Sequence, residues 1–440
     1  MKYDKFFVLA KEAGIEEAEL YISESFSLSF SLFHSEVDSY ESNKSMTILA
    51  RGIVNGKFGT ANCDSWSNAH AKYLVDEIVK NAKVVENEDP AFIFEGSKQY
   101  KKVNTFNRQL ETISVEEKMN KALELEKAIK EGDKRIVEVG GVQYEESAFS
   151  TTIMNSKGLK LAQKGNYFVY FGQAVAREGA QTKSGYDLLL DNDFAKFDAK
   201  KLAADVVKNT VSQLGGEACD SATYKAVLAP SVVRSFLSFY VGNADAEEVQ
   251  KHSSLFIGKL GQKIASKKIT IEDKPLKRNV FSRWFDDEGV ATYNKPIIKN
   301  GVLETYLYNL TTAAKEGVES TGNASRGGGK MSVGTFYTEL KPGTKSREEL
   351  FQEVGDGVFI TDVQGLHAGL NPQSGNFSLQ STGFLIKNGK LDRPLDVITV
   401  SGNLMDIFKD VEEVGNDTRV FPSGTACSSL LVKKIVVSGK

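Results

Sequence analysis

The segment that decides the fold of the N-terminal half reads Phe26-Ser-Leu-Ser-Phe-Ser-Leu32. Every second residue is apolar, and a serine stands between each pair of apolar residues. This period of two is typical of a β-strand that buries one face and exposes the other. The segment therefore predicts a half-buried strand, and the elements on either side of it can be assigned outward from there.

The surrounding residues predict a helix, several strands and a second helix. Apolar positions from Phe6 to Ala13 fit a short amphipathic helix that ends at Gly14. Two apolar-rich runs within 46–63 flank Asn55-Gly56, a dipeptide favoured by type I′ hairpins because both positions need positive φ. A helix over 68–84 completes this first unit.

The same order of elements is predicted again between residues 114 and 214. Ser114-Val-Glu-Glu117 has the pattern of a capping box and opens a helix to Gly132, and another helix spans 198–214. Strands are expected between these helices, near 136–152, 159–162 and 166–176. The segments 74–81 and 202–209 match at an offset of 128 residues, which indicates an internal duplication. Two amphipathic helices could also match by chance, and both interpretations stay open.

The sequence pattern changes after Gly215-Gly216, where signals for strands and turns replace those for helices. One helix is expected near 231–240, and Asn300-Gly301 and Asn388-Gly389 each predict a hairpin. The glycine-rich stretch Arg326–Lys330 is interpreted as a flexible loop. The expected fold class is α+β: an N-terminal α+β region over 1–215, with candidate repeats 1–90 and 114–214, followed by a β-rich, largely antiparallel domain over 216–440.

Composition limits the classes of function. Of 440 residues, 41% are hydrophobic and 26% are charged, as in soluble globular proteins. Lys and Arg number 55 against 58 Asp and Glu, a net charge of −3, so a general basic surface for nucleic acid is absent and direct nucleic-acid binding is not expected. No apolar run is long enough for a membrane span or a secretory signal. Three widely spaced cysteines fit reduced thiols, so we expect a cytoplasmic protein.

Local motifs for catalysis are missing from the sequence. There is no GxSxG elbow, no phosphate-binding loop of the GxxxxGK[ST] type and no GxGxxG after a strand. The four histidines are all more than 30 residues apart, so no helix can present two of them to one metal ion: His34, His70, His252 and His367. We assign no catalytic residue and no metal ligand to this chain.

Two segments are candidates for binding an extended peptide. The stretch 362–380 is rich in glycine and is expected to expose backbone groups at a strand end, which suits either main-chain pairing with a peptide or a β-bulge that turns a corner. Its candidate residues are Gly365, His367, Gly369, Asn371, Ser374 and Gly375. The stretch 321–327 offers Asn323 and Arg326 as donors to a carboxylate or a peptide carbonyl, or is a plain loop.

Three adjacent carboxylates, Asp286, Asp287 and Glu288, precede Gly289. Paired carboxylates can do acid–base work only when burial separates their pKa values. We expect a solvated acidic turn instead.

These segments resemble the TldD/PmbA family, and within it the PmbA (TldE) branch. The matching stretches of the C-terminal half occur in the family's order: Phe285–Val290, Ile298–Leu303, Thr321–Asn323, Asp362–Phe384, Ser401–Leu404 and Val414–Asp417. The N-terminal half matches at Ala50–Gly52, Asn55–Gly56 and Gly59–Ala61. The resemblance covers nearly the whole chain.

The resemblance implies a bacterial or archaeal cytosolic protein of a family long described as modulators of DNA gyrase and associated with proteolysis and the maturation of peptides. In the TldD branch a helix carries HExxxH, whose histidines bind zinc while the glutamate acts as general base. Alignment places that helix at residues 238–243, where Ser238, Phe239 and Asn243 stand instead. Neither serine nor asparagine replaces imidazole as a strong zinc ligand.

The family also implies how such a chain would act without its own metal. It resembles the partner half of a heteromer with a TldD-type subunit that holds the zinc, and this assembly encloses a channel for unfolded peptides. A dimer is expected, either a homodimer or a heterodimer with a TldD-type chain. No cofactor and no membrane contact are expected for this chain. Two alternatives stay open: an independent metallopeptidase with a dispersed site at His252, His367 and Asp287, and a regulatory protein that binds gyrase.

Overall fold

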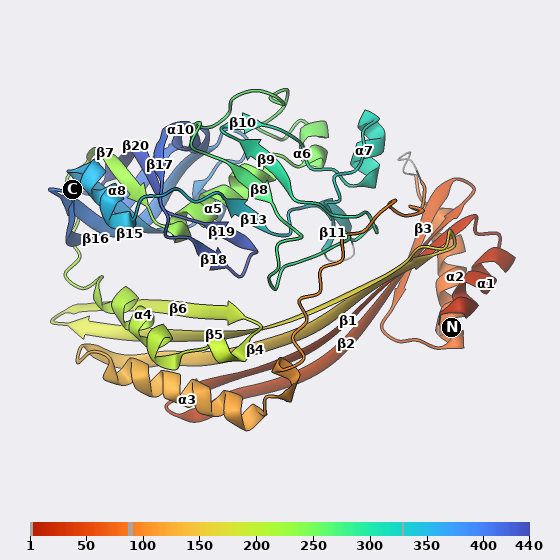
Figure 1. Cartoon of the computed structure of the whole chain (residues 1–440), viewed down its shortest axis with the longest axis horizontal. Helices are drawn as coiled ribbons and strands as arrows, with labels where there is room; N and C mark the ends of the chain where they lie inside the picture. Colours follow the sequence, from red (N-terminus) through yellow and green to blue (C-terminus); the bar gives the residue numbers. More distant parts are fainter. Residues whose placement is uncertain (1–2, 87–90, 328–329) are drawn as a thin grey trace.

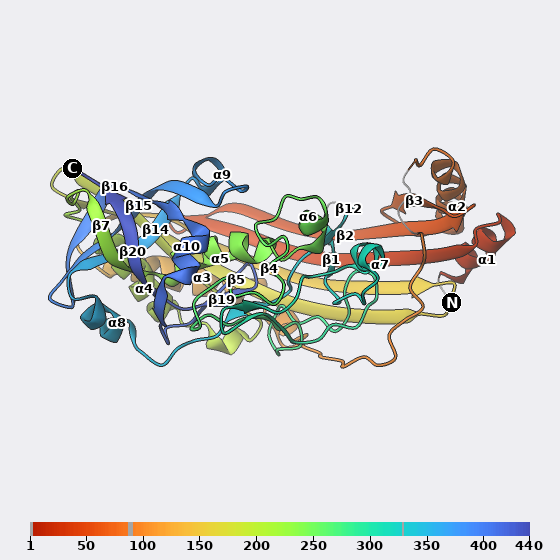
Figure 2. The same ribbon diagram turned by 90° about the horizontal axis from the view of Figure 1, so that it is seen from above.

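The chain forms a long curved sheet and a second, strand-rich domain that lies against its concave side (Figure 1). We describe residues 3–86, 91–327 and 330–440 in a computed structural model. Seen from above, β1, β2, β4 and β5 run along most of the length of the molecule (Figure 2). No helix among the described residues is long and apolar enough to cross a membrane.

The N-terminal sheet has six antiparallel strands in the order β3-β2-β1-β4-β5-β6. The strands are β1 Glu17–Phe33, β2 Glu36–Val54, β3 Lys57–Cys63, β4 Ile136–Asn155, β5 Lys160–Glu178 and β6 Gln181–Asp191. The predicted strand lies within β1, where Leu28, Phe30 and Leu32 are buried and the serines between them face the other side. The predicted hairpin is confirmed by φ of 50° at Asn55 and 73° at Gly56.

Four helices cover the sheet, two at each end (Figure 1). They are α1 Asp4–Glu12, α2 Asn68–Ala82, α3 Val115–Glu131 and α4 Ala199–Val211, and the short 3-10 turns Leu110–Thr112 and Phe194–Lys196 precede α3 and α4. The order helix, three strands, helix therefore occurs twice, and the first strands of the two units, β1 and β4, pair at the centre of the sheet. The common order fits the predicted repeats; a shared origin stays a prediction.

Two strand assignments in the second unit were wrong. The strands expected at 159–162 and 166–176 are one strand, β5, and β6 was not predicted. Gly165 lies between the two expected strands, but it pairs with Phe149, whose ring occupies the space where a Cβ of residue 165 would lie, 2.6 Å from the nearest ring carbon. The strand therefore continues through the glycine.

The C-terminal domain has two six-stranded sheets and a two-stranded ribbon. The first sheet has the order β16-β15-β14-β7-β20-β17, the second β10-β9-β8-β13-β19-β18, and β11 pairs with β12. Among the named strands of the described residues, only β7–β14 and β13–β19 pair in parallel. The strands are β7 Ala222–Leu228, β8 Ile271–Asp273, β9 Lys295–Lys299, β10 Val302–Leu303, β11 Ala324–Gly327, β12 Lys330–Val333, β13 Thr338–Leu340, β14 Gly357–Gln364, β15 Asn376–Lys387, β16 Lys390–Asn403, β17 Val411–Val414, β18 Arg419–Phe421, β19 Thr425–Cys427 and β20 Leu430–Ser438.

The helices of this domain are α5 Pro230–Gly242, α6 Ala246–Gln250, α7 Leu310–Glu316, α8 Arg347–Val354, α9 Leu366–Gly369 and α10 Leu404–Lys409. Only α5 was predicted, because the others are too short to show a helical repeat of apolar residues. α5 lies at the core of the domain, with Phe236 and Tyr240 buried against Phe377 and Phe408. Both predicted hairpins, at Asn300-Gly301 and Asn388-Gly389, are confirmed.

The glycine-rich stretch Arg326–Lys330 is not simply a loop. Arg326 and Gly327 end β11 and Lys330 begins β12, so the stretch joins two paired strands. Gly328 and Gly329 lie outside the described residues. The loop interpretation is thus wrong for the residues on either side, because pairing between the two strands extends further than the glycines suggest.

Candidate functional site

α5 is the helix on which the family's metal motif would lie. Pro230 stands at its first turn, where a missing backbone N–H costs nothing. At the far end of the helix Ser238 is exposed, Phe239 packs partly buried against the core, and Asn243 is buried.

Asn243 has a structural role at the end of α5. Its Nδ2 donates to the carbonyl of Phe239 at 3.0 Å, and its Oδ1 accepts from the backbone N–H of Leu255 at 2.7 Å. Its own carbonyl accepts from the Ser254 hydroxyl at 2.6 Å. The carboxamide therefore ties the helix end to the following segment.

The residues of the dispersed-site alternative are separated. His252 is exposed just after α6, His367 is exposed on α9, and Asp287 is buried beside the N-terminal sheet. Within residues 3–86, 91–327 and 330–440, no group of three or more His, Cys, Asp and Glu side chains is placed to hold a metal ion. The structure therefore does not bring these three residues together as a metal site.

The 362–380 segment connects two antiparallel strands, β14 and β15. Gly365 has φ of 75° and starts the short helix α9, and Gly375 has φ of 76° where β15 is about to begin. The Oδ1 of Asn371 accepts from the backbone N–H groups of Gln373 and Ser374 at 2.9 and 3.0 Å. The segment is thus a shaped turn between two strand ends.

Six of the predicted peptide-binding residues lie together in this turn. Gly365, His367, Asn371 and Ser374 are exposed, while a Cβ on Gly369 would lie 2.4 Å from the carbonyl of Ser378. The register between β14 and β15 shifts before the turn, between Ile360 and Asp362 in β14. Peptide binding by this turn stays a prediction.

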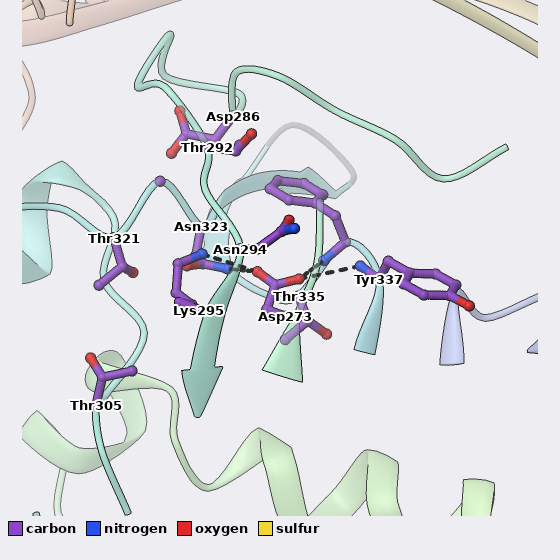
Figure 3. A network of polar contacts seen from close by, with 12 residues as sticks. Asp273, Asp286, Thr292, Asn294, Lys295, Thr305, Thr321, Asn323, Thr335 and Tyr337 are labelled. Carbon is purple, nitrogen blue, oxygen red and sulfur yellow. Dashed lines mark hydrogen bonds and ion pairs between the residues drawn. The ribbon is translucent and has the colours of Figure 1, made fainter. Parts of the chain in front are cut away.

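Asn323 lies in a different, buried network, around Asp273 (Figure 3). Its Nδ2 donates to the Asp273 carboxylate at 2.8 Å, and Lys295 Nζ lies 3.2 Å from the same oxygen. The other oxygen accepts from the backbone N–H groups of Phe336 and Tyr337. Burial lowers the pKa of Lys295, although Asp273 opposes this shift. Asn323 is fully buried and is committed to this network rather than to a surface.

The acidic stretch before Gly289 is buried, so the expected solvated turn is wrong. Asp286, Asp287 and Glu288 are 0%, 3% and 2% exposed. They face the N-terminal sheet, and the residues that meet there are called the junction cluster: Glu19, Tyr21, Arg51, Arg283, Asp286, Asp287, Glu288 and Arg326. The sequence pattern did not indicate this burial because the partners contributed by the sheet, Glu19, Tyr21 and Arg51, lie more than 200 residues away along the chain.

Arg326 and Asp287 connect the two parts of the molecule. The Tyr21 hydroxyl donates to Asp287 Oδ1 at 3.0 Å, and the backbone N–H of Arg326 donates to Oδ2 at 2.7 Å. The Arg326 guanidinium contacts Glu19 at 3.4 Å and lies 4.9 Å from the centre of the Tyr21 ring. The Arg326 side chain is only 10% exposed, so this arginine, a predicted peptide ligand, is engaged in the junction.

Arg51 links two carboxylates of the cluster. Its Nε donates to Glu19 Oε1 at 2.8 Å, and its NH1 group lies 3.9 Å from Glu288 Oε1. Glu288 Oε2 accepts from the backbone N–H of Leu310 at the start of α7, at 2.7 Å. The matching stretch Ala50–Gly52 had marked the neighbourhood of Arg51, whereas nothing in the sequence marked Glu19.

Burial perturbs the carboxyls of the cluster. Burial, and then the charge of Glu288, raise the pKa of Asp286 to about 8, against three backbone N–H groups that favour its ionised form. Burial also raises the pKa of Glu288, while Arg51 opposes the shift. The two carboxyls therefore titrate as a coupled pair, and burial favours the protonated form of both.

Comparison with known proteins places this architecture in one class. Three consecutive family models match the chain: PmbA/TldA metallopeptidase domain 1 over residues 18–82, the central domain over 108–214 and the C-terminal domain over 221–439. The long sheet, the central helix and the second domain thus define a protein of the PmbA/TldA metallopeptidase type.

Individual relatives are similar to this chain in fold or in sequence over nearly its whole length. A Thermotoga maritima protein described as a candidate modulator of a DNA gyrase superposes with a TM-score of 0.92, 32% identity and 99% coverage of both chains. TldE from Thermococcus kodakarensis has the same fold, with a TM-score of 0.92 over all of both chains at 23% identity. A metalloprotease PmbA homolog of Buchnera aphidicola is 26% identical over 432 residues, 96% of this chain and 93% of the relative. The chain belongs to the PmbA/TldD family.

Proposed function

We propose that this chain is the non-catalytic, TldE-type subunit of a two-component metallopeptidase that degrades or matures unfolded peptides. The proposal rests on the residues that α5 and its C-terminal end carry at positions 238, 239 and 243. Where the family's TldD branch has HExxxH, this helix has an exposed serine, a core-packed phenylalanine and a buried asparagine whose amide is used to cap the helix.

The replacements at these three positions support a subunit that has been adapted to do without the metal. A hydroxyl and a carboxamide are weak ligands for zinc compared with imidazole. Asn243 Oδ1 already accepts a short hydrogen bond from Leu255, so binding a metal there would first require that bond to break. The zinc and the general base would then be supplied by a TldD-type partner.

The exposed turn that connects β14 and β15 is the surface we propose for the peptide. Its exposed groups follow directly on strand ends, where an extended chain can pair through its backbone. Such pairing is open to unfolded chains but not to folded proteins, whose backbone groups are already paired. The subunit would thus favour unfolded, extended substrates whatever their amino-acid sequence.

The test is reconstitution with a TldD-type chain. Co-purification and peptidase activity on an unstructured peptide should require both chains, and the Ser238→His, Phe239→Glu, Asn243→His triple variant should not give this chain activity alone. A second variant, Asn371→Ala, changes the β14–β15 turn that we propose as the peptide surface. It should lower the peptidase activity of the mixture while the two chains still co-purify. Activity of this chain alone at the level of the mixture would refute the proposal.

A further inference from the structure

The junction cluster is a buried attachment between the N-terminal sheet and the C-terminal domain. The sheet contributes Glu19, Tyr21 and Arg51, and the domain contributes the remaining members. Apolar side chains surround it, with Trp284 and Phe285 packed in one buried group with Ile153 and Tyr21. The second attachment, near β6, consists of the Lys183–Asp396 and Arg419–Asp187 pairs, whose side chains are more exposed. The junction cluster is therefore the more buried of these two groups of charged contacts between the sheet and the domain.

The charges of the cluster do not balance. Four carboxyls, Glu19, Asp286, Asp287 and Glu288, face three guanidiniums, Arg51, Arg283 and Arg326. Two further ionisable groups face the cluster: Tyr21, whose pKa is raised by burial, and Lys295, which is already paired with Asp273. A buried charge without a partner is unfavourable, so the cluster is electrically balanced only when it holds one proton.

The geometry indicates where that proton resides. Both oxygens of Asp286 accept backbone N–H groups, which suits a carboxylate: Oδ1 from Glu288 and Val290, and Oδ2 from Ala324. Glu288 has one backbone donor and a more distant guanidinium, at 3.9 Å. Beside it, the buried Oε2 of Glu19 accepts no hydrogen bond from any described residue. Glu288 is therefore the group best placed to carry the proton.

We propose that the junction cluster is a proton-dependent latch: with one proton the sheet is held against the C-terminal domain, and loss of that proton loosens the junction so that water can reach it. Opening lets water solvate the surplus carboxylate, which the closed junction cannot do. Each pH unit between the ordinary pKa of a carboxyl and the raised pKa of the carboxyl pair shifts the balance toward the open form by up to about tenfold, and the balance levels off above the raised pKa. The proposal does not depend on the proposed peptidase role.

Trp284 provides a direct probe of the latch. It is 5% exposed, packs edge-on against Phe285 and Tyr100, and is one of two tryptophans in the chain. In a full-length Trp66→Phe background, acrylamide quenching of Trp284 is measured between pH 6.5 and 9.5. We expect the quenching constant to rise by about twofold or more between pH 6.5 and about pH 8 and to level off above it, as for a buried group that becomes accessible by local opening.

Variants separate the latch from a general effect of pH. Glu288→Gln removes the surplus charge and should flatten the profile, and Glu19→Gln, which also removes one charge, serves if the first variant does not fold. Glu304→Gln is the matched control, since Glu304 is exposed and outside the cluster. A profile that is flat in the unmodified background, or a step that persists in the folded cluster variants, would overturn the proposal. A spectral shift without increased quenching would overturn it too, because it would report charge without opening.

Discussion

Replacing Arg326 with methionine tests whether this residue holds the molecule together or binds peptide. Methionine keeps the apolar stem beside Tyr21 but removes the guanidinium that contacts Glu19 at 3.4 Å. Removing one partner of a buried ion pair typically costs about 3–5 kcal/mol. Since Arg51 still contacts Glu19, at 2.8 Å, we expect the lower end, about 3 kcal/mol in the free energy of unfolding.

The assay is urea unfolding of the full chain, followed through Trp284 fluorescence in the Trp66→Phe background. A chain with several structural units need not unfold in one step, so the comparison uses the transition that exposes Trp284. Arg278→Met is the control, because Arg278 is exposed, and a surface change of this kind shifts stability by at most about 0.5 kcal/mol.

The loss should also grow with pH. Removing Arg326 leaves four carboxyls facing two guanidiniums, and the variant can relieve the imbalance by taking up a second proton at low pH. A variant as stable as the control, with weakened peptide binding in the reconstituted system, would refute the structural role and restore Arg326 as a peptide ligand.

Three further outcomes are expected. Gly59→Ala should destabilise the first unit by about 3 kcal/mol in thermal unfolding, because the new Cβ would lie 1.9 Å from a backbone carbonyl oxygen of α2. Gly242→Ala is the control: its Cβ would meet no atom within 4 Å, so the same measurement should show a neutral or stabilising effect. Asn243→Ala should cost about 1–3 kcal/mol in urea unfolding, because a buried backbone N–H loses its acceptor. Because the pKa values of Asp286 and Glu288 are raised, the folded chain holds protons that the unfolded chain has lost between the ordinary carboxyl pKa of about 4 and about pH 8. Their contribution to stability therefore falls as pH rises from 5 to 8 and then levels off; urea midpoints that lack this fall relative to Glu288→Gln would contradict it.

Local patterns predicted the fold well where each element shows its own repeat. The alternation around Leu28 and the Asn-Gly turns needed only neighbouring residues to be interpreted, and both were confirmed. The pattern failed where a distant contact decided the outcome, as when the Phe149 ring allowed β5 to continue through Gly165. It also failed for helices of one or two turns, such as α9, which are too short to repeat.

Of the candidate site, one part was predicted from local sequence and another part was missed. The turn around Asn371 was predicted from its glycines and proline, and its conformation depends on hydrogen bonds within the turn itself. The junction cluster was missed because three adjacent carboxylates usually indicate solvent exposure, whereas Tyr21 and Arg51, contributed by strands far away in sequence, contact these carboxylates in the buried junction. Charge balance between remote residues leaves no local pattern.

The most direct test of the central claim is a peptidase assay with quantitative metal analysis, on this chain alone and mixed with a TldD-type chain. We predict that this chain alone binds no stoichiometric metal and leaves an unstructured peptide intact, and that the mixture cleaves it faster than the TldD-type chain alone. Stoichiometric zinc with cleavage by this chain alone would contradict the account, because it would require a metal site outside α5.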